Sequence, residues 1–91
     1  MAITITIPTA LRQYAGNNAT VALEADTVGA LLHGLIEQYP TLGKHIFDSG
    51  KLRSFVNVYV GDEDIRYLQG EATPLKDGET VSIIPAIAGG R

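Results

Sequence analysis

The sequence predicts a two-layer α+β domain, with one main helix packed across a mixed sheet of four or five strands. Residues near the N-terminus alternate with the period of a strand, and a stripe with helical spacing follows them. The second half of the chain carries further strand patterns separated by turns. At 91 residues the chain has the length of one domain.

The first two strands are expected over residues 3–7 and 20–24. Isoleucine alternates with threonine in the first of these runs, which is typical of a strand with one buried face. Pro8 ends this run, and the turn-forming sequence Gly-Asn-Asn at 16–18 precedes the next. We expect the two strands to form an antiparallel hairpin with a long connection.

The main helix is predicted to follow Asp26 and Thr27, whose side-chain oxygens can cap a helix N-terminus. Apolar residues then recur at steps of three and four, as in an amphipathic helix: Val28, Leu31, Leu32, Leu35, Ile36 and Tyr39. Pro40 should end the helix, because proline disfavours helical geometry in the residue before it. Gly34 lies inside the helix, where close packing on the sheet is one explanation for a glycine.

In the second half, irregular structure is expected over 41–54 and a strand over 55–60. The valines of that strand are expected to face the core. A turn is expected at 61–64 and a short strand at 65–68. The last strand is expected over 80–85.

Composition excludes several classes of function. The net charge of −3 is not accompanied by a basic stripe, which disfavours nucleic-acid binding. The absence of cysteine rules out disulfides, thiolate metal sites and a cysteine nucleophile. The N-terminus lacks the pattern of a signal peptide, and no apolar run reaches membrane-spanning length, so a cytoplasmic location without membrane attachment is expected.

The sequence gives little evidence for catalytic or metal-binding residues. His33 and His45 are isolated from each other, and two such histidines do not make a metal site. The acidic run 62–64 is better explained as a solvated turn than as a cation site. The serines lack a nucleophile motif. The chain is therefore not expected to be an enzyme.

The C-terminal run carries a more specific resemblance. Residues 77–90, DGETVSIIPAIAGG, are similar to the ending of the MoaD/ThiS sulfur-carrier family. Residues 55–60 (FVNVYV), 62–66 (DEDIR) and 7–12 resemble the CysO branch of that family, which delivers sulfur for cysteine synthesis. The likeness extends over nearly the whole chain and implies a β-grasp, ubiquitin-like fold.

The resemblance implies a globular domain over 1–85 and a flexible tail over 86–91. It also implies that a ubiquitin-activating-type adenylyltransferase uses ATP to adenylate the Gly90 carboxylate, which then becomes a thiocarboxylate. Ala88 and Gly89 would thread into the partner, since glycine lacks the Cβ that a narrow channel would exclude. The chain has no phosphate-binding loop of its own, so we expect no bound cofactor and assign the ATP to the partner.

A partner interface is predicted on the sheet face opposite the helix. If the valines of strand 55–60 face the core, Phe55 and Tyr59 lie on the other face, and Ile84 joins them, with Ile87 at the root of the tail. An exposed apolar patch of this kind often marks a protein–protein site. The alternative is that a loop or a second copy of the chain covers this patch.

Arg91 departs from the family pattern, in which the second glycine bears the reactive carboxylate. As written, Gly90 cannot be adenylated. The hypothesis is a precursor from which a peptidase removes Arg91. A residue foreign to the natural chain and a loss of carrier function are the alternatives.

The function expected from the resemblance is sulfur donation for cysteine biosynthesis, with a pyridoxal-phosphate cysteine synthase as acceptor. Sulfur donation to molybdopterin or another cofactor is one alternative. A ubiquitin-like modifier joined through Gly90 to lysines is another. A plain interaction module with a vestigial tail is a third.

Overall fold

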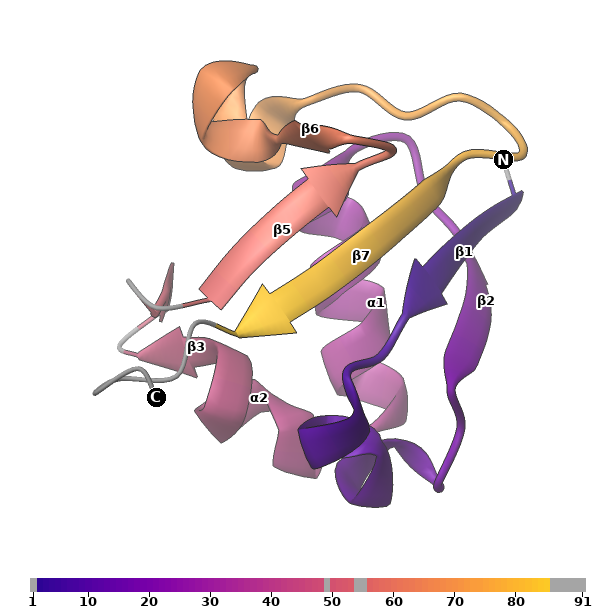
Figure 1. The fold of residues 1–91 in the computed structure, drawn as a ribbon, viewed down its shortest axis with the longest axis vertical. Helices are drawn as coiled ribbons and strands as arrows, with labels where there is room; N and C mark the ends of the chain where they lie inside the picture. The colour runs from indigo at the N-terminus through magenta and orange to yellow at the C-terminus, as the bar shows by residue number, and fades with distance from the viewer. Residues whose placement is uncertain (1, 49, 54–55, 86–91) are drawn as a thin grey trace.

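The computed structural model describes residues 2–48, 50–53 and 56–85. A mixed sheet forms one layer, and the main helix lies behind it in Figure 1. The predicted tail, 86–91, lies outside the described residues. The division between globular domain and tail therefore stays a prediction.

The main sheet has five strands in the order β2-β1-β7-β5-β6. Its parallel pair is β1 (Ala2–Thr6) and β7 (Thr80–Pro85). β1 also pairs antiparallel with β2 (Thr20–Glu24), as the two alternating runs predicted. On its other side β7 pairs antiparallel with β5 (Val56–Val60), which in turn pairs with the short β6 (Glu63–Asp64). The predicted mixed sheet is confirmed.

Helix α1 (Val28–Gln38) covers one face of this sheet (Figure 1). It begins where predicted, because the Thr27 hydroxyl accepts a hydrogen bond from the Ala30 N–H at 3.2 Å. That bond satisfies a backbone donor that the first helical turn leaves open. Tyr39 leaves the helical conformation, with φ −131° and ψ 78°, as expected for a residue before proline.

The region predicted to be irregular contains a second helix, α2 (Pro40–Ile46). Proline is favourable at a first helical position, where its missing N–H would have no partner in any case. A small hairpin of β3 (Phe47–Asp48) and β4 (Lys51–Leu52) follows. Most of the region expected to be irregular thus forms a complete short helix and a hairpin.

The predicted strand at 65–68 is wrong. Ile65–Tyr67 forms a 3-10 helix, η2, and strand pairing is confined to the preceding β6. The Asp64 carboxylate accepts a hydrogen bond from the Arg66 N–H at 2.9 Å, and the Leu68 N–H donates to the Ile65 carbonyl at 3.0 Å. Local bonds from a short acidic side chain therefore replace the ladder that a strand would need. A further 3-10 turn, η3 (Gly70–Ala72), follows.

The core lies between α1, α2 and the inner face of the sheet. Among the described residues, the largest fully buried side chains are Ile3, Ile5, Ile7, Val28, Leu31, Leu32, Leu35, Leu42, Ile46, Val58 and Val81. Val56 and Val58 face this core as predicted, and Val60 packs against it while partly exposed. Another 3-10 helix, η1 (Thr9–Ala15), contributes Leu11 and Ala15. No helix in the described part of the chain is long and apolar enough to cross a membrane.

Candidate functional site

The central strand β7 ends at Pro85, the last described residue before the predicted reactive tail. Antiparallel pairing with β5 continues along β7 to its end, where Pro85 lies opposite Val56. The start of β7 is held on its other side by β1, from Thr80 to Ser82. A chain that continues past Pro85 therefore departs from a strand anchored in the middle of the sheet. Gly90, Gly89, Ala88 and the precursor residue Arg91 lie outside the described residues, and their roles stay predictions.

The face of the sheet that α1 does not cover carries two of the predicted interface residues (Figure 1). Ile84 lies opposite Asn57, and Tyr59 lies opposite Ser82, which makes Ile84 and Tyr59 diagonal neighbours on that face. Ile84 is 49% exposed, and Tyr59 is half-buried. The predicted placement of these two side chains is confirmed. Phe55 and Ile87, the other two predicted interface residues, lie outside the described residues.

A hollow of about 380 Å³ lies beside the end of β7. Among the described residues it is lined by Leu11, Lys44, His45, Arg53 and Pro85, so four separate elements or connections contribute to it. The Arg53 Nε–H donates a hydrogen bond to the Lys44 carbonyl at 3.0 Å. This bond ties the end of α2 to the segment after β4. The hollow therefore combines basic side chains with an apolar rim next to the departure point of the tail. For convenience we call it the basic hollow.

His45 is the most unusual side chain of the basic hollow. Its ring stacks on that of Tyr14, with centroids 4.1 Å apart and an angle of 23° between the planes. Its Nε2 atom is buried and has no hydrogen-bond partner among the described residues. A buried polar atom without a partner costs about 1–3 kcal/mol. This position was not expected from the sequence, which gave His45 no role.

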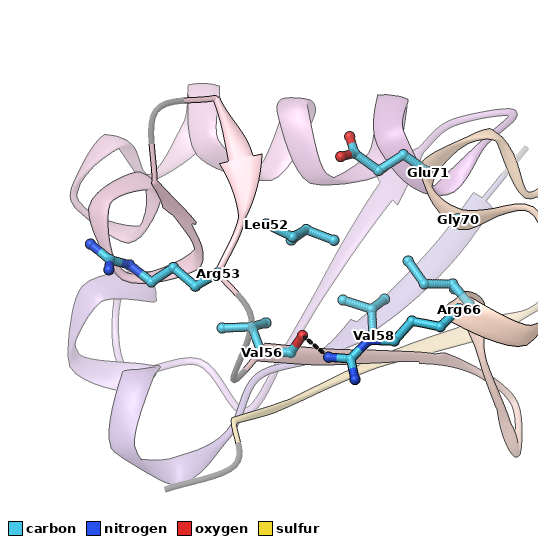
Figure 2. A pocket seen from close by; sticks show the side chains of 8 residues that line it. Leu52, Arg53, Val56, Val58, Arg66, Gly70 and Glu71 are labelled. Atoms are coloured by element: carbon cyan, nitrogen blue, oxygen red, sulfur yellow. Dashed lines mark hydrogen bonds between the residues drawn. The ribbon is translucent and has the colours of Figure 1, made fainter. Parts of the chain in front are cut away.

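A second hollow, of about 400 Å³, opens between β5 and the 3-10 turns that follow β6. Figure 2 shows Leu52 pointing into it, whereas Arg53 extends away from it. The Arg66 Nη2–H donates to the Val56 carbonyl at 3.3 Å along its edge. Its floor consists of buried core side chains, including Val58. The hollow is a shallow opening over the core and contains no arrangement of groups suited to catalysis.

His33 and the acidic run at 62–64 are the other candidate residues. His33 is exposed and meets Phe47 edge-on, with ring centroids 5.9 Å apart. Within the described residues no group of histidine, aspartate and glutamate side chains could hold a metal ion. Of the acidic run at 62–64, Asp64 has the structural task of capping η2.

The basic hollow is the feature that sequence reasoning missed. Lys44 and His45 are neighbours in the chain, but Leu11, Arg53 and Pro85 are brought to them only by the tertiary fold. No periodicity or motif connects these positions. The resemblance drew attention to the tail and the sheet face and gave no signal for α2.

Comparison with known proteins shows to which family the chain is related. The model of the ThiS family matches residues 5–90. The sulfur carrier protein CysO of Mycobacterium tuberculosis is 43% identical over 93 residues, covering 99% of this chain and all of the relative. Small archaeal modifier protein 3 of Haloferax volcanii is 38% identical over 64 residues, which is 70% of each chain.

Solved structures agree with the sequence relatives. A chain from the crystal structure of the Amycolatopsis orientalis BexX/CysO complex superposes with a TM-score of 0.89 at 36% identity, covering 97% of this chain and 99% of that one. The β-grasp prediction is thereby confirmed. The prediction that the chain is not an enzyme agrees with the names of its relatives, which are carriers and modifiers. With a match over residues 5–90 and a full-length relative at 43% identity, the chain belongs to the ThiS family.

Proposed function

We propose that the chain is a sulfur carrier whose reactive group is the carboxylate of Gly90, exposed by removal of Arg91. The observation that carries the proposal is where the family match lies: it runs to Gly90 and leaves Arg91 outside. The name of the full-length relative CysO supports the carrier role, since that protein is called a sulfur carrier protein.

The chemistry requires a partner, because a free carboxylate is a poor electrophile at neutral pH. In the proposed sequence a Gly90 carboxylate oxygen attacks the α-phosphate of ATP on the partner, and pyrophosphate leaves. A sulfur nucleophile at the oxidation level of sulfide then attacks the acyl carbon, and AMP leaves. The product is a thiocarboxylate, which is a better nucleophile than the carboxylate it replaces. This chain supplies the acyl group and its presentation, while the partner supplies ATP and the catalytic groups.

The fold is suited to presenting Gly90 to the active site of a partner. Pro85 is anchored in the central strand, and Gly90 is the fifth residue after it in the chain. An extended segment of that length spans roughly 16–18 Å. Gly90 could therefore enter a partner's active site while the globular part stays outside. Ala88 and Gly89 offer little side-chain bulk to a narrow entrance.

The proposed docking surface is the uncovered sheet face around Ile84 and Tyr59. A large apolar side chain that is half exposed, as Ile84 is, gains by being covered in a complex. Ile84 is also one residue from Pro85, so a partner seated there is next to the tail. Phe55 and Ile87 are proposed to extend this surface on the grounds of the sequence.

The proposed acceptor is a cysteine synthase that uses pyridoxal phosphate. The thiocarboxylate sulfur would displace the activating group of a serine derivative, which gives a thioester between Gly90 and the new cysteine. The cysteine amine would then attack the acyl carbon and move the acyl group from sulfur to nitrogen, and a peptidase would hydrolyse the resulting amide to release cysteine and the Gly90 carboxylate. A peptidase of the same type is proposed to remove Arg91. The support is the likeness to CysO over the full chain. Sulfur transfer to molybdopterin or another cofactor uses the same thiocarboxylate and remains the alternative within this class.

A ubiquitin-like modifier is the second candidate, and the similarity to a small archaeal modifier protein favours it. The adenylation step is the same in both functions. The difference is the nucleophile, which for a modifier is a lysine amine that forms an amide with Gly90. In a cell lysate with ATP and the partner, a modifier yields ladders of covalent conjugates, whereas a carrier yields a chain with one oxygen replaced by sulfur.

The proposal is tested by incubating the full chain and a Gly90-ended chain with the cognate adenylating enzyme and ATP. Pyrophosphate release and intact mass report the adenylate. We expect the Gly90-ended chain to be adenylated promptly and the full chain not at all. Equal adenylation of both would refute the precursor hypothesis, and no adenylation of the Gly90-ended chain would refute the carrier proposal.

A further inference from the structure

We propose that the basic hollow receives a carboxylate side chain of the adenylating partner and so fixes how that partner sits around the tail. The inference rests on the proposed function, because it concerns the protein that receives Gly90. It assigns a binding role to Lys44, His45 and Arg53, which lie off the predicted sheet-face interface.

The chemistry of the lining fits one acidic side chain on an apolar stem. Lys44, His45 and Arg53 contribute nitrogen donors, and Leu11 and Pro85 supply an apolar rim. No acidic residue occurs among the described residues that line the hollow. The chain as a whole carries a net charge of −3, so this concentration of basic groups is a local exception. Complementary charge across an interface mainly steers association and fixes its register.

The arrangement is held in place before any partner arrives. The hydrogen bond from Arg53 Nε to the Lys44 carbonyl keeps the Arg53 side chain against the end of α2. The side chain of Lys44 is exposed, so its ammonium group can reach a partner. Stacking on Tyr14 fixes the plane of the His45 ring. A carboxylate would thus meet Arg53 and His45 in conformations that are already restricted, which reduces the entropic penalty of binding.

His45 supplies the independent observation. Its buried Nε2 lacks a hydrogen-bond partner among the described residues, although buried polar atoms are usually satisfied. A carboxylate seated in the hollow, after a small adjustment of the covering atoms, would accept a hydrogen bond from this nitrogen. Complex formation would then supply a hydrogen bond to an atom that has none among the described residues.

A purely structural explanation accounts for only part of these facts. Lys44 and His45 lie in the last turn of α2, where basic residues interact favourably with the helix dipole. That role explains their charge. It does not explain the unsatisfied Nε2, and it does not explain why Pro85 borders the same hollow. Because the chain continues from Pro85 to Gly90 in sequence, a protein that binds the residues directly after Pro85 would lie next to this hollow.

The test compares the affinity of Gly90-ended chains for the cognate adenylating enzyme by isothermal titration calorimetry. Lys44→Glu should weaken binding about tenfold, because it places like charges together. Lys76→Glu is the matched control, since this exposed lysine precedes the opposite end of β7. It makes the same change in net charge and should leave the affinity within about twofold of wild type. Raising the salt concentration should weaken the wild type more than Lys44→Glu.

A second variant tests the histidine. His45→Phe keeps an aromatic ring for stacking on Tyr14 and removes Nε2, so the free energy of unfolding should stay level or rise. Its affinity for the adenylating enzyme should fall several-fold. Wild-type affinity for both Lys44→Glu and His45→Phe would overturn the proposal, as would an equal loss in Lys76→Glu.

The kinetics of adenylation separate this inference from its alternatives. If the hollow binds the partner, Lys44→Glu should raise KM and leave kcat nearly unchanged. A lower kcat at unchanged affinity would mean that the hollow acts on the chain's own tail and would overturn the proposal. If the wild-type Gly90-ended chain is never adenylated, the proposed function fails, and this inference falls with it.

Discussion

Ile84 on β7 lies opposite Asn57 on β5 and stays 49% exposed, although it is part of the most central strand of the sheet. The preceding residue, Ile83, lies opposite Val58 and is 2% exposed. Two consecutive isoleucines in one strand thus face different environments, because successive side chains point to opposite faces. The chain needs Ile83 for its core, whereas folding gives no reason for an isoleucine at position 84.

Substitutions at these two positions should separate docking from folding. Ile84→Asp should reduce the adenylation efficiency of a Gly90-ended chain by about tenfold or more, because it puts a charge into the centre of the proposed interface. Its free energy of unfolding should change by less than about 1 kcal/mol, as is usual for exposed positions. Steady-state kinetics and urea denaturation measure the two effects.

The control is Ile83→Ala, which should lower the free energy of unfolding by about 2–5 kcal/mol by leaving a cavity. Under conditions where it is folded, its adenylation efficiency should stay near that of the wild type. Loss of activity in Ile83→Ala alone, with full activity in Ile84→Asp, would contradict the assigned interface.

The glycines at 34 and 78 should respond in opposite directions to alanine. A Cβ at Gly34 would meet only Leu23 Cδ1, at an ordinary contact distance of 3.9 Å. Close packing therefore does not require this glycine, and Gly34→Ala should stabilise the protein by about 0.5–1 kcal/mol through helix propensity. Gly78 has φ +88°, and Gly78→Ala should destabilise by about 1–2 kcal/mol. Thermal unfolding of the two variants checks both signs, and a destabilised Gly34→Ala would show that the helix packs more tightly than described.

The stability of the first turn of α1 should depend on the Thr27 hydroxyl. Thr27→Ala removes the acceptor for the Ala30 N–H and should cost about 1 kcal/mol of unfolding free energy. Thr27→Ser retains the oxygen and should restore most of that loss. Chemical denaturation of the pair is the measurement. Equal stability of the two variants would mean that the cap contributes little.

The elements that the sequence predicted well are those whose burial follows a local period. The alternation at 3–7, the stripe of α1 and the run at 80–85 each reflect one face turned to the core, so neighbours in sequence suffice to recognise them. The run at 65–68 was misjudged because one side chain, Asp64, decides its conformation. Hydrogen bonding of this kind leaves no period in the sequence.

Part of the candidate site could likewise be predicted from the sequence, and part of it could not. Ile84 and Tyr59 could be placed on one face by alternation and register, and the structure confirms that placement. The basic hollow could not be predicted, because Lys44 and Arg53 come from different elements and meet only when α2 packs beside the end of β7. An unsatisfied atom such as His45 Nε2 is likewise a property of the packed structure.

The central claim is that Gly90 ends the active chain and carries sulfur. Mass spectrometry of the protein isolated from its own cells tests both parts at once. We expect a species that lacks Arg91 and whose C-terminal glycine has the mass of a thiocarboxylate, with one oxygen replaced by sulfur. A population that consists only of the chain with Arg91 still attached, with no sulfur on its C-terminus, would contradict it.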